Sequence, residues 1–329
     1  MPAVAQVTIH FSQFPQSVRR DLLESLRTRQ VNHKFHYDSV KQAQQWLALH
    51  QAYSPSRTDP DCAAIYDQSF AAAAPRLRSK RVHLVGLGCG GGQKDTRLIQ
   101  RLHDLGKEVF YTPSDVSTAM VLVARQSALG VLPPEKCTPF VCDLASSEDL
   151  PAIIGESAPA DALRLITFFG MLPNFEPGVI LPRLAALVGP GDYLLLSANL
   201  APGSDYAAGV RCILPLYDNT LTRDWLMTFL LDTGIERDDG TLRFVVEPDP
   251  DGLGLRRVAA YFEFVRPREI HVDEKAFAFG SGDEVRLFFS YRHTPELVRS
   301  LLGQHGLQVL DQWVAPSEEE GVFLASRAP

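Results

Sequence analysis

The sequence predicts an α/β protein in which a Rossmann-like parallel sheet ends in an antiparallel hairpin, with a second, smaller α+β lobe. Three observations predict this fold. Between residues 81 and 200, short apolar runs typical of buried strands alternate with helix-like stretches, as in parallel βαβ units. The first run ends in a cluster of five glycines between positions 86 and 92. The last two runs, 307–314 and 321–328, enclose the turn-like residues 315–320 and predict the hairpin.

The first elements are helices and the βαβ units that follow them. Apolar residues at helical spacing predict a helix at 15–30, and further helices are expected at 41–50 and 61–75. Strands are predicted at 81–88, 108–115, 138–144, 163–172 and 192–200, with helices at 94–106, 117–130 and 179–191. Ser117 is a suitable N-terminal cap for the second of these helices.

Residues 202–265 interrupt the alternation and predict the smaller lobe. They contain a helical pattern at 216–234 and strand patterns at 241–249 and 256–267. A strand at 285–292 and a helix beginning at Thr294-Pro295 then resume the α/β pattern before the hairpin. We expect a cofactor domain of residues 60–204 and 285–329. We expect a substrate lobe of residues 1–59 and 205–284 over the carboxyl ends of the strands.

The composition limits the classes of function. A formal net charge of −7 without any Lys/Arg-rich block argues against nucleic acid and anionic membranes as partners. No apolar stretch reaches the length of a membrane span and residues 1–14 lack a signal-peptide pattern, so a cytoplasmic location is expected. The five scattered cysteines and nine unclustered histidines predict neither a disulfide framework nor a metal site. The sequence leaves the oligomeric state open, and a monomer is the working expectation.

The glycine turn and two acids indicate the cofactor. Residues 86–91 satisfy G-x-G-x-x-G, a weak signal that also occurs in dinucleotide sites. Here Lys94 and Asp95 begin the following helix, and the acid disfavours a diphosphate. Asp115 ends the second strand, where a carboxylate can accept both ribose hydroxyls of an adenosine. Asp143 ends the third strand and can accept the adenine amine, with Leu144 against the ring. These features favour S-adenosylmethionine over NAD.

An ordered set of motifs resembles one known family. "LVGLGCGGGQKDTRL", "TPSDVS", "VCDL", "FFGMLPNFEP" and "LYDNTLT" occur in the order and spacing of the histidine Nα-methyltransferases of ergothioneine biosynthesis. "KFHYDSV" and "AYSPSRTD" upstream, and "FFSYRHTPELVRSLLGQHGL" downstream, are similar to further segments of that family. The resemblance implies a class I methyltransferase, to which the terminal hairpin is also similar. It places the cofactor on residues of the glycine turn and strand ends: Gly88, Gly90, Lys94, Asp115, Asp143 and Leu144.

The resemblance also implies the acceptor site. Tyr53 and Asn174 match residues that position the α-amine and carboxylate of an amino acid, Tyr217 matches a carboxylate-binding residue, and Tyr37 lies close by. Ser290 matches one member of a Glu-x-Ser pair that holds an imidazole ring. The other member is replaced by Phe288, which leaves an imidazole N–H without an acceptor and predicts an apolar, roomier pocket. We therefore expect N-methylation of an amino acid or amino-acid-derived amine other than histidine.

Two other functions remain as alternatives to a methyltransferase: an oxidoreductase and a protein that binds its ligand without catalysis. A nicotinamide-dependent oxidoreductase would use the G-x-G-x-x-G turn. The Tyr-x-x-x-Lys pattern of short-chain reductases would follow that turn, whereas the match here, Tyr37 to Lys41, precedes it. A catalytically silent protein would bind S-adenosylmethionine or an amino acid without turnover. Cofactor titration separates the first alternative from a methyltransferase, and a product assay separates the second.

Overall fold

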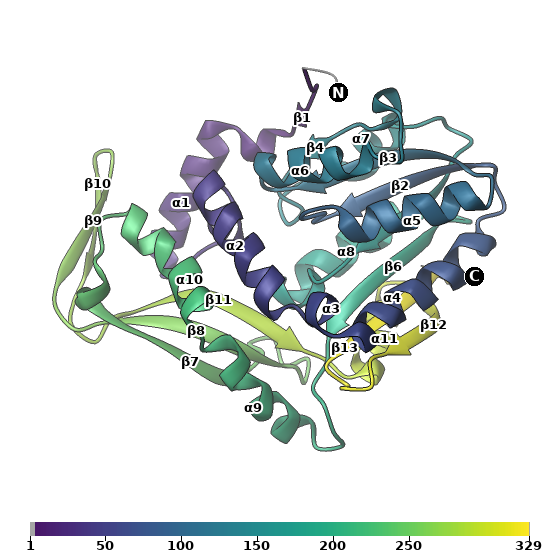
Figure 1. Cartoon of the computed structure of the whole chain (residues 1–329). Helices are drawn as coiled ribbons and strands as arrows, with labels where there is room; N and C mark the ends of the chain where they lie inside the picture. Colours follow the sequence, from purple (N-terminus) through teal and green to yellow (C-terminus); the bar gives the residue numbers. More distant parts are fainter. Residues whose placement is uncertain (1–3, 329) are drawn as a thin grey trace. The chain divides into compact units, whose positions relative to one another are not determined.

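The computed structural model describes residues 4–328, which form two compact units (Figure 1). The first unit comprises the residues up to Gln13, Pro55–Leu200 and the residues from His293 onward. The second comprises Phe14–Ser54 and Ala201–Arg292. Each unit therefore combines segments that are far apart in the sequence.

The first unit is built on an eight-stranded sheet with the order β1-β4-β3-β2-β5-β6-β13-β12. Its strands are β1 (Thr8–Ile9), β2 (Arg81–Leu87), β3 (Glu108–Asp115), β4 (Phe140–Val141), β5 (Leu163–Phe168), β6 (Tyr193–Asn199), β12 (Leu307–Val314) and β13 (Glu320–Arg327). The pairs from β1 to β6 are parallel, whereas β13 runs antiparallel to both β6 and β12. The predicted parallel sheet with a terminal antiparallel hairpin is confirmed.

Two layers of helices cover this sheet. Helices α4 (Pro60–Ala73), α5 (Gln93–Asp104) and α6 (Thr118–Ala128) pack against one another on one face, and the short α3 (Pro55–Thr58) adjoins α4. Helices α7 (Leu150–Glu156), α8 (Pro177–Leu187) and α11 (Pro295–Gln304) form the other layer. As predicted, the Ser117 side chain caps α6 by accepting the N–H of Met120.

The strand order reverses at β2, because β3 and β4 lie on one side of it and β5 and β6 on the other. In open α/β sheets the ligand binds outside the carboxyl ends of the strands at such a point.

The second unit packs helices on a small antiparallel sheet. Its helices are α1 (Pro15–Thr28), α2 (Val40–Tyr53), α9 (Tyr206–Tyr217) and α10 (Thr220–Asp232). Its three-stranded sheet has the order β11 (Glu284–Arg292), β8 (Arg256–Phe264), β7 (Gly240–Pro248), and β9 (Arg268–Val272) pairs with β10 (Lys275–Phe279). Its core combines aliphatic side chains with several aromatic ones, among them Phe35, Trp225, Phe229, Phe262 and Phe264. Short 3-10 helices complete both units: Phe11–Gln13, His33–His36, Ala74–Arg76, Pro134–Lys136, Leu172–Asn174 and Arg237–Asp239.

The structure corrects three expectations from the sequence. Residues 285–292 do not return to the large sheet, because β11 pairs antiparallel with β8 in the second unit. Residues 4–13 and 55–59 belong to the first unit rather than to the smaller lobe, since β1 pairs with β4 and α3 packs on α4. The expectation for residues 1–3 lies outside the described residues. The helix expected at 216–234 is interrupted, because Asn219 caps a new helix by accepting the N–H of Thr222.

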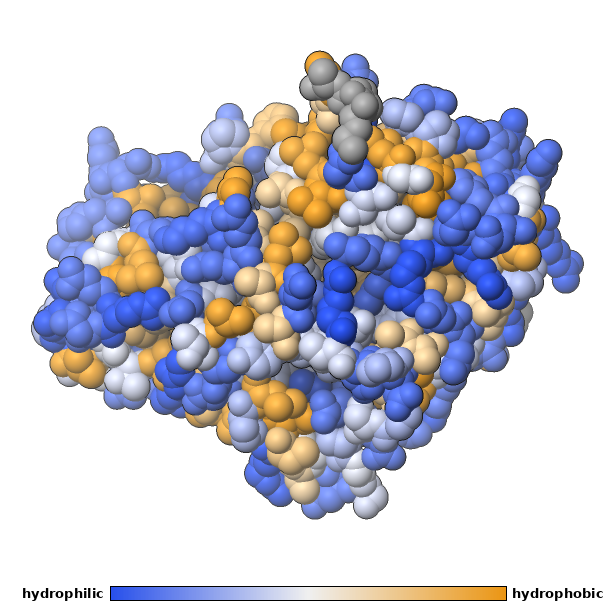
Figure 2. Space-filling view, viewed as in Figure 1, coloured by the Kyte–Doolittle hydropathy of each residue, from blue (hydrophilic) through white to orange (hydrophobic). Residues whose placement is uncertain are grey.

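The face shown in Figure 2 is largely hydrophilic, with hydrophobic residues gathered mainly near the top and centre of the view. No helix in the described part of the chain combines the length and the apolarity that crossing a membrane requires.

Candidate active site

The glycine turn after β2 has a backbone that only glycine adopts readily. Gly88, Gly90 and Gly92 have φ values of +61°, +51° and +71°, in the left-handed region. A Cβ atom on Gly88 would also lie 2.5 Å from Cγ of Met171, in the segment after β5. The turn therefore brings bare backbone to the carboxyl end of β2, as the sequence predicts for a cofactor loop.

Asp115 ends β3 beside this turn. Its Oδ2 accepts the N–H of Gly90 at 3.2 Å and its Oδ1 accepts the N–H of Ser117 at 3.0 Å. Each carboxylate oxygen has a further lone pair, so the donor requirements of a ribose diol fit this group. Burial raises the pKa of Asp115 to about 6, and the hydrogen bonds from Ser117 and Gly90 oppose that rise.

This pKa predicts a pH dependence of cofactor binding. Below about pH 6, Asp115 becomes protonated and loses acceptor capacity. The dissociation constant of S-adenosylmethionine should therefore increase as the pH falls from 7.5 to about 5, measured by calorimetry. In Asp115→Asn the part of this dependence that arises from Asp115 should disappear. An identical pH profile in the two proteins would contradict the prediction.

Asp143 and Leu144 lie in the loop after β4, and the start of the chain holds this loop. The N–H of Asp143 donates to Oγ of Ser12 at 2.9 Å, and its Oδ1 accepts the N–H of Ala145 at 3.0 Å. Nδ1 of His10 lies 2.9 Å from Oγ of Ser12. Asp143 and Leu144 are both buried. Sequence analysis missed His10 and Ser12, because the strand and the 3-10 helix beside them have only two and three residues and leave no detectable periodicity.

Two charged residues lie in the first turn of α5: Lys94 is half-buried and Asp95 is buried. Nζ of Lys94 lies 3.9 Å from the ring centre of Tyr66. The Asp95 carboxylate accepts the hydroxyls of Tyr111 and Thr167, each at 2.8 Å. Burial raises the pKa of Asp95 to about 6, and these hydrogen bonds oppose the rise. Asp95 therefore ties the start of α5 to β3 and β5.

Asn174 follows β5 in the 3-10 helix that begins at Leu172. Its N–H donates to the carbonyl of Met171 at 2.9 Å, the residue that packs against Gly88. The N–H of Gly170 donates to Oγ of Ser197 at 2.8 Å and fixes the start of the same segment on β6. Asn174 therefore belongs to the unit that contains all the predicted cofactor residues.

In the second unit, the structure brings Tyr217, Ser290 and Phe288 together. The hydroxyl of Tyr217 donates to Oγ of Ser290 at 2.9 Å and accepts from Nη2 of Arg292 at 3.0 Å. The rings of Tyr217 and Phe288 have centres 6.3 Å apart. Sequence analysis missed Arg292, which lies two residues after Ser290 and hence on the same face of β11. A buried guanidinium beside the Tyr217 hydroxyl suits an anionic ligand group.

Phe288 is enclosed by aromatic rings. Its ring centre lies 5.6 Å from Trp225 and 5.4 Å from His33, and only 6% of the residue is exposed. Tyr37 packs edge-on against Trp225 of the same cluster, with ring centres 5.5 Å apart. The surroundings of Phe288 are therefore largely aromatic, and a roomier pocket than that of the histidine enzymes remains a prediction.

Tyr53 has no comparable contacts. It is the last residue of α2 and is 53% exposed. Within residues 4–328 the hydroxyl of Tyr53 makes no hydrogen bond to another side chain. Tyr53 and Asn174 belong to different units, so their convergence on one substrate remains a prediction.

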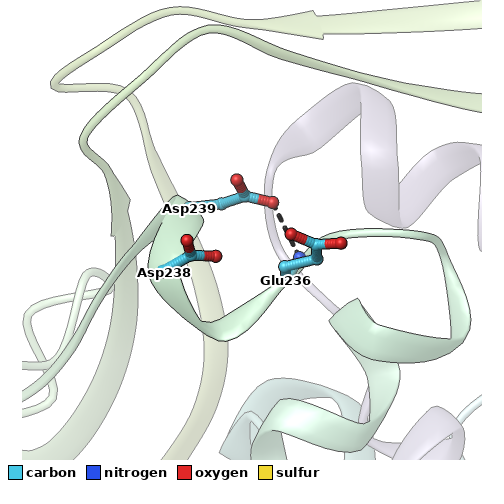
Figure 3. A group of neighbouring side chains, drawn as sticks. All are labelled: Glu236, Asp238 and Asp239. Carbon is cyan, nitrogen blue, oxygen red and sulfur yellow. Dashed lines mark hydrogen bonds between the residues drawn. The ribbon is translucent and has the colours of Figure 1, made fainter.

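A group of three acids in the second unit is already neutralised by arginines. Figure 3 shows Glu236, Asp238 and Asp239, with Oδ2 of Asp239 accepting the N–H of Glu236 at 2.7 Å. Arg266 and Arg268 contact Oδ1 of Asp239 at 2.6 and 2.5 Å, and Arg266 also contacts Asp238 at 3.0 Å. We therefore interpret the group as a structural ion-pair network.

The network predicts an acid-sensitive contribution to stability. Burial raises the pKa of Asp239, but hydrogen bonds from Arg268, the Glu236 N–H and Arg266 outweigh it and lower the pKa to about 2. This contribution is complete above the unfolded pKa of about 3.9 and is lost as the pH falls through about 2. Asp239→Asn should lower the melting temperature by several degrees at pH 7, and the difference from wild type should shrink toward pH 2. Asp238→Asn, at an exposed position, should change the melting temperature little.

Comparisons with known proteins identify a related family. A family model described as "Histidine-specific methyltransferase, SAM-dependent" matches residues 18–206 and 254–327. These ranges contain Tyr53, Asn174, Phe288 and Ser290, whereas Tyr217 lies between them. No curated protein matches the sequence significantly.

Several solved structures are similar. An S-adenosylmethionine-dependent methyltransferase from Clostridium acetobutylicum ATCC 824 has a TM-score of 0.46 and 13% identity, covering 87% of this chain and 99% of its own. The CcbJ methyltransferase from Streptomyces caelestis has a TM-score of 0.41 and 16% identity, covering 80% and 89%. Magnesium protoporphyrin IX methyltransferase from Synechocystis PCC 6803, with bound SAH, has a TM-score of 0.45 and 14% identity, covering 88% and 95%.

Proposed function

Because the chain belongs to the family of histidine-specific, SAM-dependent methyltransferases, we propose that it methylates the amine of an amino acid or amino-acid-derived small molecule other than histidine. The family match confirms the resemblance carried by the ordered motifs, and the protein is a SAM-dependent methyltransferase. The nicotinamide-dependent alternative is thereby set aside.

The cofactor supplies a methyl group on a positively charged sulfur. The residues of the first unit suit its adenosine portion: Asp115 offers acceptors for the ribose hydroxyls and Asp143 lies in a buried loop at the neighbouring strand end. The flanking glycines let the backbone approach it closely. We assign no further chemistry to these residues, since methyl transfer by in-line displacement depends mainly on alignment.

The acceptor's amino-acid end fits a second set of residues. Tyr217 and Arg292 form a hydrogen-bonded pair, and a guanidinium with a hydroxyl beside it suits a carboxylate. Tyr53 and Asn174 would orient the amine, which must be neutral to attack. A free α-amine is largely protonated at neutral pH, so its neutral fraction grows as the pH rises. No residue is assigned as general base.

The proposal that histidine is not the methyl acceptor rests on the residue at position 288. Phe288 stands where the related family has a carboxylate, and in the structure its ring is buried against Trp225 and His33. Ser290, the retained member of the pair, already accepts the hydroxyl hydrogen of Tyr217. An imidazole N–H placed here would lack a carboxylate acceptor, at a cost of about 1–3 kcal/mol.

We also propose a cytoplasmic location, in keeping with five free cysteines.

A screen of acceptors tests the proposal. Amino acids and their amine derivatives, histidine among them, are incubated with S-adenosylmethionine, and release of S-adenosylhomocysteine is measured. Less polar acceptors should be turned over faster than histidine. Efficient methylation of histidine would contradict the exclusion but not the family. Cofactor binding without turnover of any acceptor would instead support the silent alternative.

A further inference from the structure

The half-buried ammonium group of Lys94 lies on two aromatic rings beside the glycine turn. Lys94 is the second residue of α5, and its Nζ stacks on the rings of Tyr66 and Phe169, whose centres lie 3.9 and 5.7 Å away. Among the residues that the structure describes, no carboxylate forms an ion pair or hydrogen bond with this ammonium. The three N–H donors therefore suit a ligand anion, and S-adenosylmethionine carries a carboxylate on its amino-acid end.

The position of Lys94 is electrostatically unfavourable by itself. The N-terminus of a helix carries partial positive charge, which disfavours a cation in the first turn. Burial lowers the pKa of Lys94, while the nearby negative charge of Glu320 opposes this effect. The ionisable groups that face Lys94 from the surrounding elements are Glu320 on β13, Cys62 and Tyr66 on α4, Arg57 on α3 and Asp95 on α5.

Glu320 is held in place by two donors from α4. It is the first residue of β13 and pairs in register with Asn199, the last residue of β6, so it lies at the carboxyl end of β6. Its Oε1 accepts the hydroxyl of Tyr66, and its Oε2 accepts the thiol of Cys62 at 3.3 Å. Burial and the neighbouring carboxylate raise the pKa of Tyr66 well above its ordinary value, so the hydroxyl remains a donor.

These contacts link the terminal hairpin to the cofactor loop. Glu320 fixes the hydroxyl of Tyr66, and the face of that tyrosine ring supports the Lys94 ammonium. We propose that Glu320 is a positioning residue for S-adenosylmethionine: it keeps the Lys94 ammonium in place and charged, ready to bind the cofactor's carboxylate. The proposal concerns only the cofactor and is independent of which acceptor is methylated.

A double-mutant cycle tests this role. The dissociation constant of S-adenosylhomocysteine, which carries the same amino-acid carboxylate, is measured by calorimetry for wild type, Glu320→Gln, Lys94→Met and the double variant. Glu320→Gln should weaken binding about fivefold in the wild-type background and less than twofold in the Lys94→Met background, because its effect passes through Lys94. Glu319→Gln, which removes a charge from the same turn, should leave the dissociation constant unchanged.

A pH profile distinguishes positioning from a structural role. Loss of the Glu320 charge should lower the pKa of Lys94 further, so affinity should fall at a lower pH in Glu320→Gln than in wild type between pH 7 and 10. Tyr66→Phe retains the ring and should weaken binding less than Lys94→Met. Equal losses from Glu320→Gln in both backgrounds, or unchanged affinity and pH profile in the folded variant, would overturn the proposal.

Discussion

Replacing Asp115 with alanine is expected to weaken the binding of S-adenosylmethionine at least tenfold. The carboxylate offers charge-assisted acceptors to the ribose, and losing about 1.4 kcal/mol of binding free energy corresponds to a factor of ten. The substitution also leaves the buried N–H groups of Gly90 and Ser117 without their acceptor. The turn itself should therefore loosen, which adds to the loss. Calorimetric titration of the purified variant measures the effect.

Two controls separate binding from folding. Asp115→Asn keeps an oxygen that can accept one backbone N–H, so it should fold more stably than the alanine variant while still losing the charge. Asp104→Ala removes an exposed carboxylate from the end of α5 and should not affect the dissociation constant. Wild-type affinity in a folded Asp115→Ala protein would show that this residue does not hold the cofactor.

Phe288→Glu is expected to raise the rate of histidine methylation about tenfold over wild type. A carboxylate at this position could accept the imidazole N–H, which recovers a buried hydrogen bond worth about 1–3 kcal/mol. His33 is a nearby donor for the new group, because its ring nitrogens have no hydrogen-bond partner within residues 4–328. The measurement is kcat/KM for histidine, with S-adenosylhomocysteine as the detected product.

The aromatic surroundings of Phe288 determine the controls for this variant. Removing a buried ring leaves space beside Trp225 and Tyr217, so some stability will be lost. Phe288→Leu creates a similar loss of volume without an acceptor and should not gain activity on histidine. Phe288→Gln adds a neutral acceptor and should gain less than the glutamate variant. Equal rates for the leucine and glutamate variants would show that hydrogen bonding does not limit histidine turnover.

The large sheet was predictable because its signals are local. Each strand from β2 to β6 is a short apolar run, and the intervening helices have apolar residues at helical spacing. Strand β11 shows the limit of this approach. Its apolar run is as clear as the others, but the register that pairs Ser290 with Val258 rather than with the large sheet is a long-range property. Such pairing depends on packing that periodicity does not report.

In the candidate site, too, residues with local sequence signals were predictable and residues that act through distant partners were not. Asp115 and the glycines were predictable, since strand ends and left-handed turns have local signatures. Arg292 and Glu320 were missed, because each acts through partners more than 70 residues away: the Tyr217 hydroxyl and the side chains of α4. The motif resemblance assigns a role to Ser290 but none to Arg292, two positions further along the strand.

The anchoring of residues 8–13 on the loop after β4 has a practical consequence. Ser12 accepts the N–H of Asp143, and His10 contacts Asp149 at 3.0 Å as well as Ser12. Purification tags fused before this segment, or proteolytic trimming into it, would therefore act on the loop that we propose to bind the adenine. Affinity for S-adenosylmethionine should be compared between tagged and tag-free preparations before any variant is judged defective.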